Sequence, residues 1–364
     1  MASTLEITKS LLSPPGGTIQ ETIEEMGMSQ AELAERMGRP KEKINDIIKG
    51  KEPVTTATAF KLEKVLGIPA SFWLNREKAY RTKIYELQQQ NELEKKKDWL
   101  QKFPIKDIRK LGWLPDTKET YLLVNALLQF FGIASPEEWE RIYVDKEISV
   151  AFRISLANTQ SPHAISAWLR MGELQSQTLT LSEFDKKKFK ETLTEIKDLA
   201  YLMPLNFAAE LQNICSRSGV AVVYTPALPQ APISGASRWF HNRPIIQLSG
   251  RFRTNDHFWF TFFHEAAHII LHGKKDIFLE NVEGTENDQE KENDANVFAA
   301  KILIDPKDWR TILESRPLTL DKIKNYAAQM RVDPGIIVGR LQHEKKIPQS
   351  FGNELKKKID IFSV

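Results

Sequence analysis

The stretch FWFTFFHEAAHIILHG, residues 258–273, decides the fold of the C-terminal part of this chain. Its bulky apolar residues predict a helix buried in a domain core. Residues four apart share one face of a helix, so His264 and His268 can present both imidazoles to a single metal ion. Glu265 lies between them and can accept a proton from a water that the metal activates. Metal-assisted hydrolysis is therefore the leading hypothesis, and a pair of hydrogen-bonded core histidines is the alternative.

A third ligand would decide between these interpretations, because a catalytic zinc usually has three protein ligands and a water. The segment DQEKENDANVFAAKILID, residues 288–305, has apolar residues at amphipathic spacing and predicts a second helix. Glu292 on this helix could complete a His/His/Glu site, and Asn296, one turn later, could hydrogen-bond a ligand from behind. Glu290 and Asp294 compete with it, and spacing alone leaves Glu292 only modestly ahead.

Other polar residues near this motif have less specific signals. His272 follows His268 by one turn, and we expect it to cap the helix end or to hydrogen-bond a ligand, with Gly273 closing the helix. Four side chains are candidates for stabilising the oxyanion that forms when water attacks a peptide carbonyl, although a solvated surface role is the expectation for each. These four are His241, Arg238, Arg251 and His257.

The combination of HEAAHIILHG and ENDANVFAAKILID resembles the ImmA/IrrE family of metallopeptidases, whose pattern is a HExxH helix followed by ExxAxxFAxxLL. The preceding GASRWFHNRPIIQLSGRFRTNDHFWFTFF is also similar, with a strand before the metal helix. The resemblance spans roughly the last 160 residues, the size of one domain. It implies a zincin-like α+β fold with one Zn²⁺ bound by His264, His268 and Glu292, and Glu265 as general base. Asp305-Pro306 departs from the family's hydrophobic-Pro pair, but it lies in a loop and leaves these roles intact.

The N-terminal segment, residues 18–75, contains residues that typically begin and end short helices. Ser29 is suited to cap a helix that runs to Met37, with Glu32 completing a capping box, and Gly38 ends this helix. Pro40 fits the first turn of the next helix, which ends near Gly50. A further helix is predicted over 55–66, closed by Gly67. The apolar contacts between the first two helices are predicted from Ala31, Leu33, Ala34, Ile44, Ile47 and Ile48.

Two short helices joined by a glycine turn are the arrangement that inserts a reading helix into the major groove of DNA. SQAELAERMG, INDIIKGK and VLGIPASFWLN resemble the Xre-like helix-turn-helix family, in particular its HigA-type antitoxin branch, over roughly residues 8–80. The resemblance implies a reading helix over 40–49. Its candidates for base edges or backbone are Lys41, Lys43 and Asn45, and those for phosphate are Ser29, Gln30, Lys49 and Lys51.

Two carboxylates qualify this prediction. Glu42 and Asp46 also lie on or near the reading helix, and phosphate repels them. Either these carboxylates accept hydrogen bonds from cytosine amino groups, or they lie away from the face that contacts DNA. The alternative is that this small helical domain binds protein.

The middle of the chain carries no catalytic motif. Residues 76–97 predict an exposed, charged connecting helix, and further helices follow, including one over 186–201. The tryptophans at 99, 113, 139 and 168 are expected to anchor helix packing. Residues 220–226 and 244–249 predict strands. The expected organisation is a helix-turn-helix bundle over 1–80, a helical connecting region over 81–203 and an α+β peptidase domain over 204–364, so the fold class is mainly α with a small β-sheet.

Composition agrees with a soluble protein made of ordinary domains. The 364 residues carry a formal net charge of only +3, so DNA affinity would rest on local patches. The single cysteine, Cys215, suits a reducing compartment and reads as a buried helix residue. Without a recognisable signal peptide or membrane-spanning run, we expect a cytoplasmic protein.

These observations predict a regulator that joins a DNA-binding module to a peptidase. The expected partners are operator DNA, a specific protein substrate such as a helix-turn-helix repressor or a toxin-system partner, and a second copy of the chain. The main alternative is a non-hydrolytic antitoxin-type regulator whose metal domain senses a ligand or binds a partner. A broad digestive peptidase fits poorly with a DNA-binding head.

Overall fold

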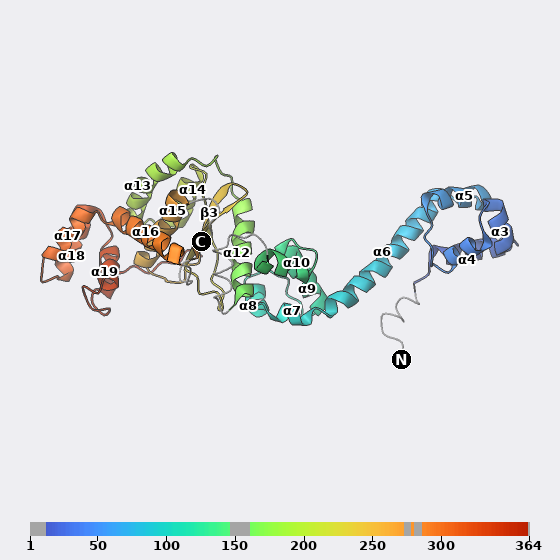
Figure 1. The fold of residues 1–364 in the computed structure, drawn as a ribbon, viewed down its shortest axis with the longest axis horizontal. Coiled ribbons are helices and arrows are strands. Elements are labelled where there is room, and N and C mark those ends of the chain that lie inside the picture. The colour runs from blue at the N-terminus through green and yellow to red at the C-terminus, as the bar shows by residue number, and fades with distance from the viewer. Residues whose placement is uncertain (1–11, 146–160, 273–277, 280–285, 363–364) are drawn as a thin grey trace. The chain divides into compact units, whose positions relative to one another are not determined.

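The computed structural model describes residues 12–145, 161–272, 278–279 and 286–362, and this part of the chain is mainly helical with one small sheet (Figure 1). The chain divides into two compact units. The first comprises Met1–Asp98 with Glu119–Asn125, and the second comprises Trp99–Lys118 with Ala126–Val364. The predicted fold class, mainly α with a small β-sheet, is confirmed.

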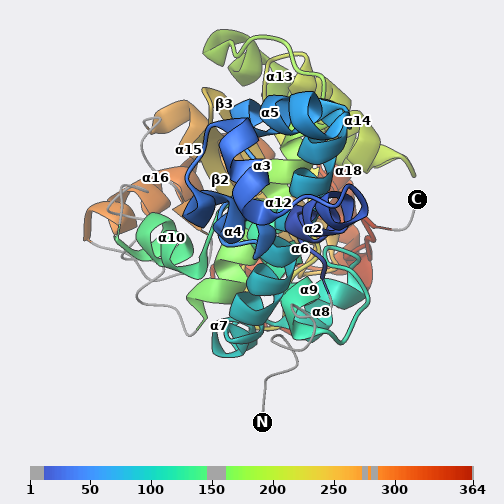
Figure 2. The ribbon, with the colours of Figure 1, turned by 90° about the vertical axis from the view of Figure 1, so that its right-hand side faces the viewer.

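The first unit is a small bundle of four short helices that pack against the start of a long one (Figure 2). Its core is built around Ile23, Leu33 and Trp73, which are 0% exposed. The remaining buried residues of this cluster come from every helix of the bundle, so each helix contributes one apolar face. The helices are α2 (Pro15–Glu25), α3 (Gln30–Met37), α4 (Lys41–Ile48), α5 (Thr56–Leu66) and α6 (Ala70–Glu94).

The helix ends of this unit follow the predicted punctuation. Ser29 Oγ accepts a hydrogen bond from the Glu32 amide at 3.2 Å and caps α3. The Glu32 carboxylate pairs with Arg36 one turn later at 2.6 Å, so it contacts Arg36 in place of the Ser29 amide that the predicted capping box requires. Gly38 and Gly67 end α3 and α5 with φ values of +60° and +74°, a left-handed conformation that glycine adopts without strain.

Two sequence-based expectations for this unit need correction. Ala31 was predicted to contact the neighbouring helix but is exposed, and Met37, at 3% exposure, is one of the buried residues of α3 instead. The charged helix predicted over 76–97 begins earlier, at Ala70, and ends at Glu94. The early start has a physical reason, because the first turns of α6 carry Trp73 into the core of the bundle.

The helices between α6 and the sheet range in length from 5 to 17 residues. Trp99 and Trp139 are buried and contact Phe103 edge to face, which confirms their predicted anchoring role, whereas Trp113 is half-buried and stacks on Phe130. These elements are α7 (Lys97–Gln101), α8 (Ile105–Lys110), α9 (Thr120–Phe131), α10 (Pro136–Glu140), a π-helical turn η1 (Arg141–Asp145), α12 (Pro162–Gln177), α13 (Lys186–Leu202) and α14 (Phe207–Ser216).

A mixed sheet of four strands lies in the second unit in the order β1-β3-β2-β4. Strands β1 (Ala221–Tyr224) and β3 (Arg243–Leu248) are parallel; β1 falls within the segment predicted over 220–226, and β3 begins and ends one residue before the segment predicted over 244–249. Strand β2 (Gly235–Phe240) forms an antiparallel hairpin with β3, and its other edge pairs with the two-residue β4 (Phe278–Leu279). The hairpin turn consists of His241 and Asn242, both at positive φ, which is the conformation of a type I′ turn.

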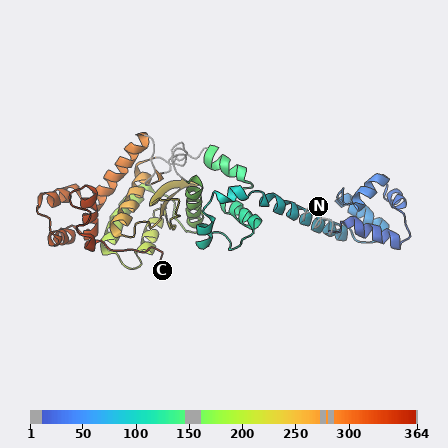
Figure 3. The same ribbon diagram turned by 90° about the horizontal axis from the view of Figure 1, so that it is seen from below.

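The second unit buries the predicted apolar helix, α15 (Asn255–Leu271), between the sheet and other helices (Figures 1 and 3). Trp259, Phe262 and Phe263 are 0% exposed and belong to the largest core cluster. Cys215 at the end of α14 is fully buried, as predicted. The last elements are α16 (Glu286–Leu303), α17 (Pro306–Glu314), α18 (Leu320–Met330), α19 (Pro334–His343) and a 3₁₀ turn η2 (Asn353–Leu355). Within the described ranges, every helix is too short or too polar to span a bilayer.

Candidate metal centre

Three side chains from two helices converge in the second unit. His264 and His268 lie one turn apart on α15, and their Nε2 atoms are 3.0 Å from each other. Glu292 on α16 places one carboxylate oxygen 3.0 Å from His264 Nε2 and the other 3.3 Å from His268 Nε2. Both histidines are 2% exposed, whereas the Glu292 side chain is 34% exposed. The structure thus brings the three predicted ligands together at one point that retains access to solvent.

The donor spacing fits a zinc ion. Zinc bonds of about 2.0–2.1 Å in a tetrahedral arrangement place neighbouring ligand atoms about 3.3 Å apart. The three separations here, 3.0, 3.0 and 3.3 Å, are close to that value. Two imidazole nitrogens and a carboxylate are also the donor types that zinc prefers. Within the described residues, Glu290 and Asp294 are exposed and fall outside this group.

The protonation states favour a cation at this point. Burial lowers the pKa of His268 to about 4, so its ring is neutral at pH 7. Burial raises the pKa of Glu292, but hydrogen bonds from His264 and His268 outweigh this effect and lower the pKa to about 2. A neutral imidazole and an ionised carboxylate are the forms that bind metal, so these two groups need not lose a proton first near pH 7.

Two further predicted residues contact the Nδ1 atoms of the histidines, whose Nε2 atoms lie near Glu292. Asn296 Oδ1 is 3.0 Å from His264 Nδ1. Because an amide oxygen only accepts, Asn296 can hold the ring proton on Nδ1 when the Nε2 lone pair of His264 binds a metal ion instead of donating to Glu292. His272 is the C-cap residue of α15, and its Nδ1 is 3.0 Å from His268 Nδ1. Gly273, predicted to close the helix, lies outside the described residues.

Glu265, the proposed general base, is 0% exposed and lies against the start of β2. A Cβ atom added at Gly235 would come within 2.9 Å of Glu265 Oε1 and 2.6 Å of Thr261 Cγ2. Only a residue without a side chain allows this approach of strand to helix. Gly235 is not among the site residues predicted from the sequence, although a glycine within a strand is the signal for such a contact.

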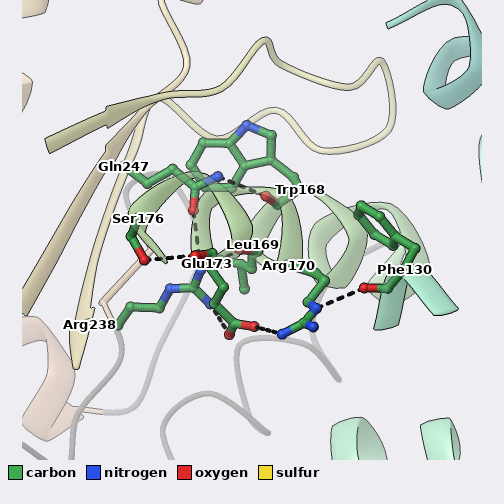
Figure 4. A network of polar contacts seen from close by, with 8 residues as sticks. All are labelled: Phe130, Trp168, Leu169, Arg170, Glu173, Ser176, Arg238 and Gln247. Atoms are coloured by element: carbon green, nitrogen blue, oxygen red, sulfur yellow. Dashed lines mark hydrogen bonds and ion pairs between the residues drawn. The ribbon is translucent and has the colours of Figure 1, made fainter. Parts of the chain in front are cut away.

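Of the four oxyanion candidates, Arg238 lies in an environment that contradicts the expected surface role. It is 5% exposed and its Nη1 donates to Glu173 Oε1 at 3.0 Å, while Nη2 donates to the Leu169 carbonyl and to Gln247 Oε1 (Figure 4). Burial lowers the pKa of Arg238, and the charge of Glu173 opposes this effect. The physical reason for its burial is α12, which packs against the sheet and supplies Glu173.

The same network continues to another helix. Glu173 also accepts from Arg170 Nη1 at 2.8 Å, and Arg170 Nε donates to the Phe130 carbonyl at 2.8 Å (Figure 4). Arg238 therefore joins a structural network. The other three candidates, His241, Arg251 and His257, are exposed, as expected.

The start of the metal helix is fixed by the C-terminal segment. The Asn255 backbone amide donates to the Lys357 carbonyl, and the Lys357 amide donates to Asn255 Oδ1, both at 3.0 Å. Asn255 Nδ2 donates to Asp333 Oδ1 at 2.7 Å, and Asp333 is 1% exposed. Because these residues are 78 and 102 positions away from Asn255 in the sequence, this support is set by the tertiary fold.

In the first unit, the residues proposed to contact DNA lie on or beside α3 and α4. Lys41, Lys43 and Lys49 are exposed, and Asn45 is half-buried. The Lys43 ammonium group pairs with Glu52, which raises the pKa of Lys43. The other two candidates already have partners, since Ser29 caps α3 and Gln30 Nε2 donates to Gln20 Oε1 at 2.7 Å. Residues 8–11 of the predicted DNA-binding region lie outside the described residues.

Comparison with protein families finds two domains in this chain. A helix-turn-helix model matches residues 19–73, and a model described as an IrrE N-terminal-like domain matches residues 215–342. The latter is a family of the metallopeptidase type. The chain is also 32% identical over 78 residues to Virulence-associated protein I of Dichelobacter nodosus, which covers 21% of this chain and 72% of that protein.

Two solved structures are similar to part of the chain. One, named as an antidote protein of a plasmid maintenance system from Nostoc punctiforme, is 29% identical, with coverage of 21% of this chain and 85% of that one and a TM-score of 0.20. The other, named as an addiction module antidote protein of a HigA family from Coxiella burnetii, is 30% identical, with coverage of 22% and 89% and a TM-score of 0.21. TM-scores this low establish no common fold across the chain.

Proposed function

Because this chain belongs to the helix-turn-helix family of Virulence-associated protein I and carries an IrrE N-terminal-like domain, we propose that it is a DNA-binding regulator with a zinc-dependent endopeptidase. The substrate would be a specific protein partner, such as a helix-turn-helix repressor or a toxin-system protein. The observation that carries the proposal is that His264, His268 and Glu292 converge on one point. Glu265 lies on the same helix as the two histidines. We propose that this regulator lies in the cytoplasm, together with the operator DNA that it would bind.

The residues of the site suit peptide hydrolysis. A zinc ion held by the two imidazoles and Glu292 would supply the Lewis acidity that makes water a nucleophile near neutral pH. Glu265 would accept a proton from the attacking water and return it to the leaving nitrogen. Asn296 would hold His264 in the tautomer that keeps Nε2 available.

Replacing Glu265 with Gln tests the enzymatic part of the proposal. Glutamine has the same shape but cannot accept the proton, so we expect one zinc per chain in both proteins and a roughly 10²- to 10⁴-fold loss of cleavage in the variant. Zinc is measured by elemental analysis of the purified full chain. Cleavage is measured by mass spectrometry of new protein N-termini in cells that express either form, and casein tests general proteolysis.

Three outcomes separate the alternatives. New N-termini that occur with the wild type and not with Glu265→Gln, together with intact casein, support a specific peptidase. The same set of N-termini with both forms, at equal zinc content, would favour the non-hydrolytic regulator. Degraded casein would favour a broad peptidase.

The DNA-binding part of the proposal rests on the helix-turn-helix domain and the exposed basic residues of α4. The first probe is the DNA upstream of the gene for this chain, in a fluorescence anisotropy titration at several salt concentrations. We expect Kd to rise steeply with salt, because phosphate contacts release counterions. Equal binding to this fragment and to a shuffled sequence of the same length would argue against an operator there.

A further inference from the structure

A cavity of about 780 Å³ that is partly open to solvent lies beside the metal centre, lined mainly by α15, α16, α17 and α19 of the second unit. This volume is in the range of small-molecule sites. His264, His268 and Glu292 are not among the described residues that line it, so the cavity is separate from the ligand cluster. Much of its wall is apolar and is supplied by Phe260, Val297, Leu303, Ile304, Trp309 and Ile336.

The charged residues of the lining favour an anion. Asp256 pairs with Lys356 at 2.7 Å, and Glu344 pairs with Arg340 at 2.9 Å, so both acids of the lining are neutralised by lysine or arginine. Lys301 and Arg310 also line the cavity, are exposed, and have no acidic partner within the described ranges. The wall therefore carries two basic residues in excess, which attract a negatively charged ligand.

One buried carboxylate oxygen of a lining residue lacks a hydrogen-bond donor. Asp256 is 6% exposed, and its Oδ2 contacts Lys356. Its Oδ1 is buried and has no hydrogen-bond partner in the part of the chain that the structure describes. A buried carboxylate oxygen is normally hydrogen-bonded, so a ligand N–H or O–H in the cavity would supply the missing donor when the Asp256 carboxylate turns toward it.

We propose that this cavity binds a small amphipathic anion, an apolar body that carries one carboxylate or sulfonate and one N–H or O–H donor. The anionic group lies near Lys301 and Arg310, the apolar body fills the space beside Trp309 and Ile336, and the donor contacts Asp256. Asn296 is part of the same wall, so the ligand lies against the side chain that hydrogen-bonds His264. The proposal does not depend on hydrolysis at the metal centre.

The test uses 8-anilinonaphthalene-1-sulfonate, which has two aromatic parts, one sulfonate and one N–H. We expect saturable fluorescence enhancement with the full chain, and a Kd that rises roughly tenfold in K301E/R310E because two attractive charges become repulsive. The matched control is K307E/K324E, which changes net charge equally at exposed positions outside the lining and should bind as the wild type does. Equal affinity in all three proteins would overturn the proposal.

A second measurement separates charge from apolar contact. N-acetyltryptophan should displace the probe from wild type at a concentration roughly tenfold lower than its uncharged amide does, because only the acid is anionic. Equal displacement by both compounds would contradict an anion site. Ala300→Trp fills the cavity from α16 and should abolish the enhancement in protein whose circular dichroism is unchanged. Undiminished enhancement in such folded protein would place the probe elsewhere and overturn the assignment.

Discussion

The first unit and the metal centre of the second place their proposed functional side chains in opposite environments. Lys41 at the start of α4 and Lys49 just after its end are exposed to solvent, whereas His264, His268 and Glu265 are almost entirely buried. Exposed basic groups act through a field that salt screens. Buried donors act through fixed geometry, since a shift of their supporting helices moves the atoms that bind the metal.

The two regions also differ in how their shape is held. In the first unit, the helix ends are fixed by residues close in sequence. The Ser29 side chain, for example, caps α3 by accepting from the amide of Glu32, three residues later. The metal helix relies on distant residues, including Asn296, Asp333 and Lys357. Changes in one region should therefore leave the other intact, and the following variants test that independence.

The largest effect is expected for His268→Ala. Removing one of three protein donors should reduce zinc from one equivalent per chain to nearly none, because two donors rarely retain zinc against buffer. Elemental analysis measures the zinc, and anisotropy with the upstream DNA fragment should give an unchanged Kd. His343→Ala, an exposed histidine at the end of α19, is the control and should keep its zinc. Retained zinc in His268→Ala would remove this residue from the ligand set.

A smaller effect is expected for Asn296→Ala. Loss of the hydrogen bond that orients His264 should weaken zinc affinity about tenfold to a hundredfold. A competition titration with a chromophoric chelator gives the affinity. Asn293→Ala changes an exposed asparagine of the same helix and is the matched control. If the two variants bind zinc equally well, Asn296 does not support the ligand.

Lys41→Glu tests the exposed side of the comparison. Loss of one phosphate contact should reduce the slope of log K against log salt by about one and weaken binding to all sequences alike. Lys78→Glu on α6 makes the same charge change at another exposed position of the first unit. Zinc content should stay at one equivalent in both. An equal loss of DNA affinity in the two variants would indicate a general charge effect and would leave α4 without a special role.

The smallest effect is expected for Ser29→Ala. Removing the side chain that caps α3 should lower the free energy of unfolding of the first unit by about 1 kcal/mol. Native-state hydrogen exchange of the α3 backbone amides in the full chain measures this change. Ser71→Ala, an exposed serine in the first turn of α6, should change it little. A stability equal to that of the parent would show that the cap contributes nothing measurable.

Local patterns in the sequence predicted the elements that depend on nearby residues. The helix caps at Ser29, Gly38 and Gly67 and the buried apolar helix of residues 258–273, observed over 255–271, are in this class. A hydrogen bond or an apolar stripe within a few residues defines each of them. The HEAAH spacing also predicted that His264 and His268 face the same point, since helical periodicity alone sets that geometry.

Tertiary packing decided what local spacing left open. The choice of Glu292 over Glu290 and Asp294 for the cluster depends on how α16 crosses α15, and the burial of Arg238 depends on Glu173 of α12. The same is true of Gly235, which lies against Glu265 only because β2 packs on the metal helix. These contacts join residues far apart in the chain, and their distances follow from how whole helices and strands fill a common core, which no short stretch of sequence specifies.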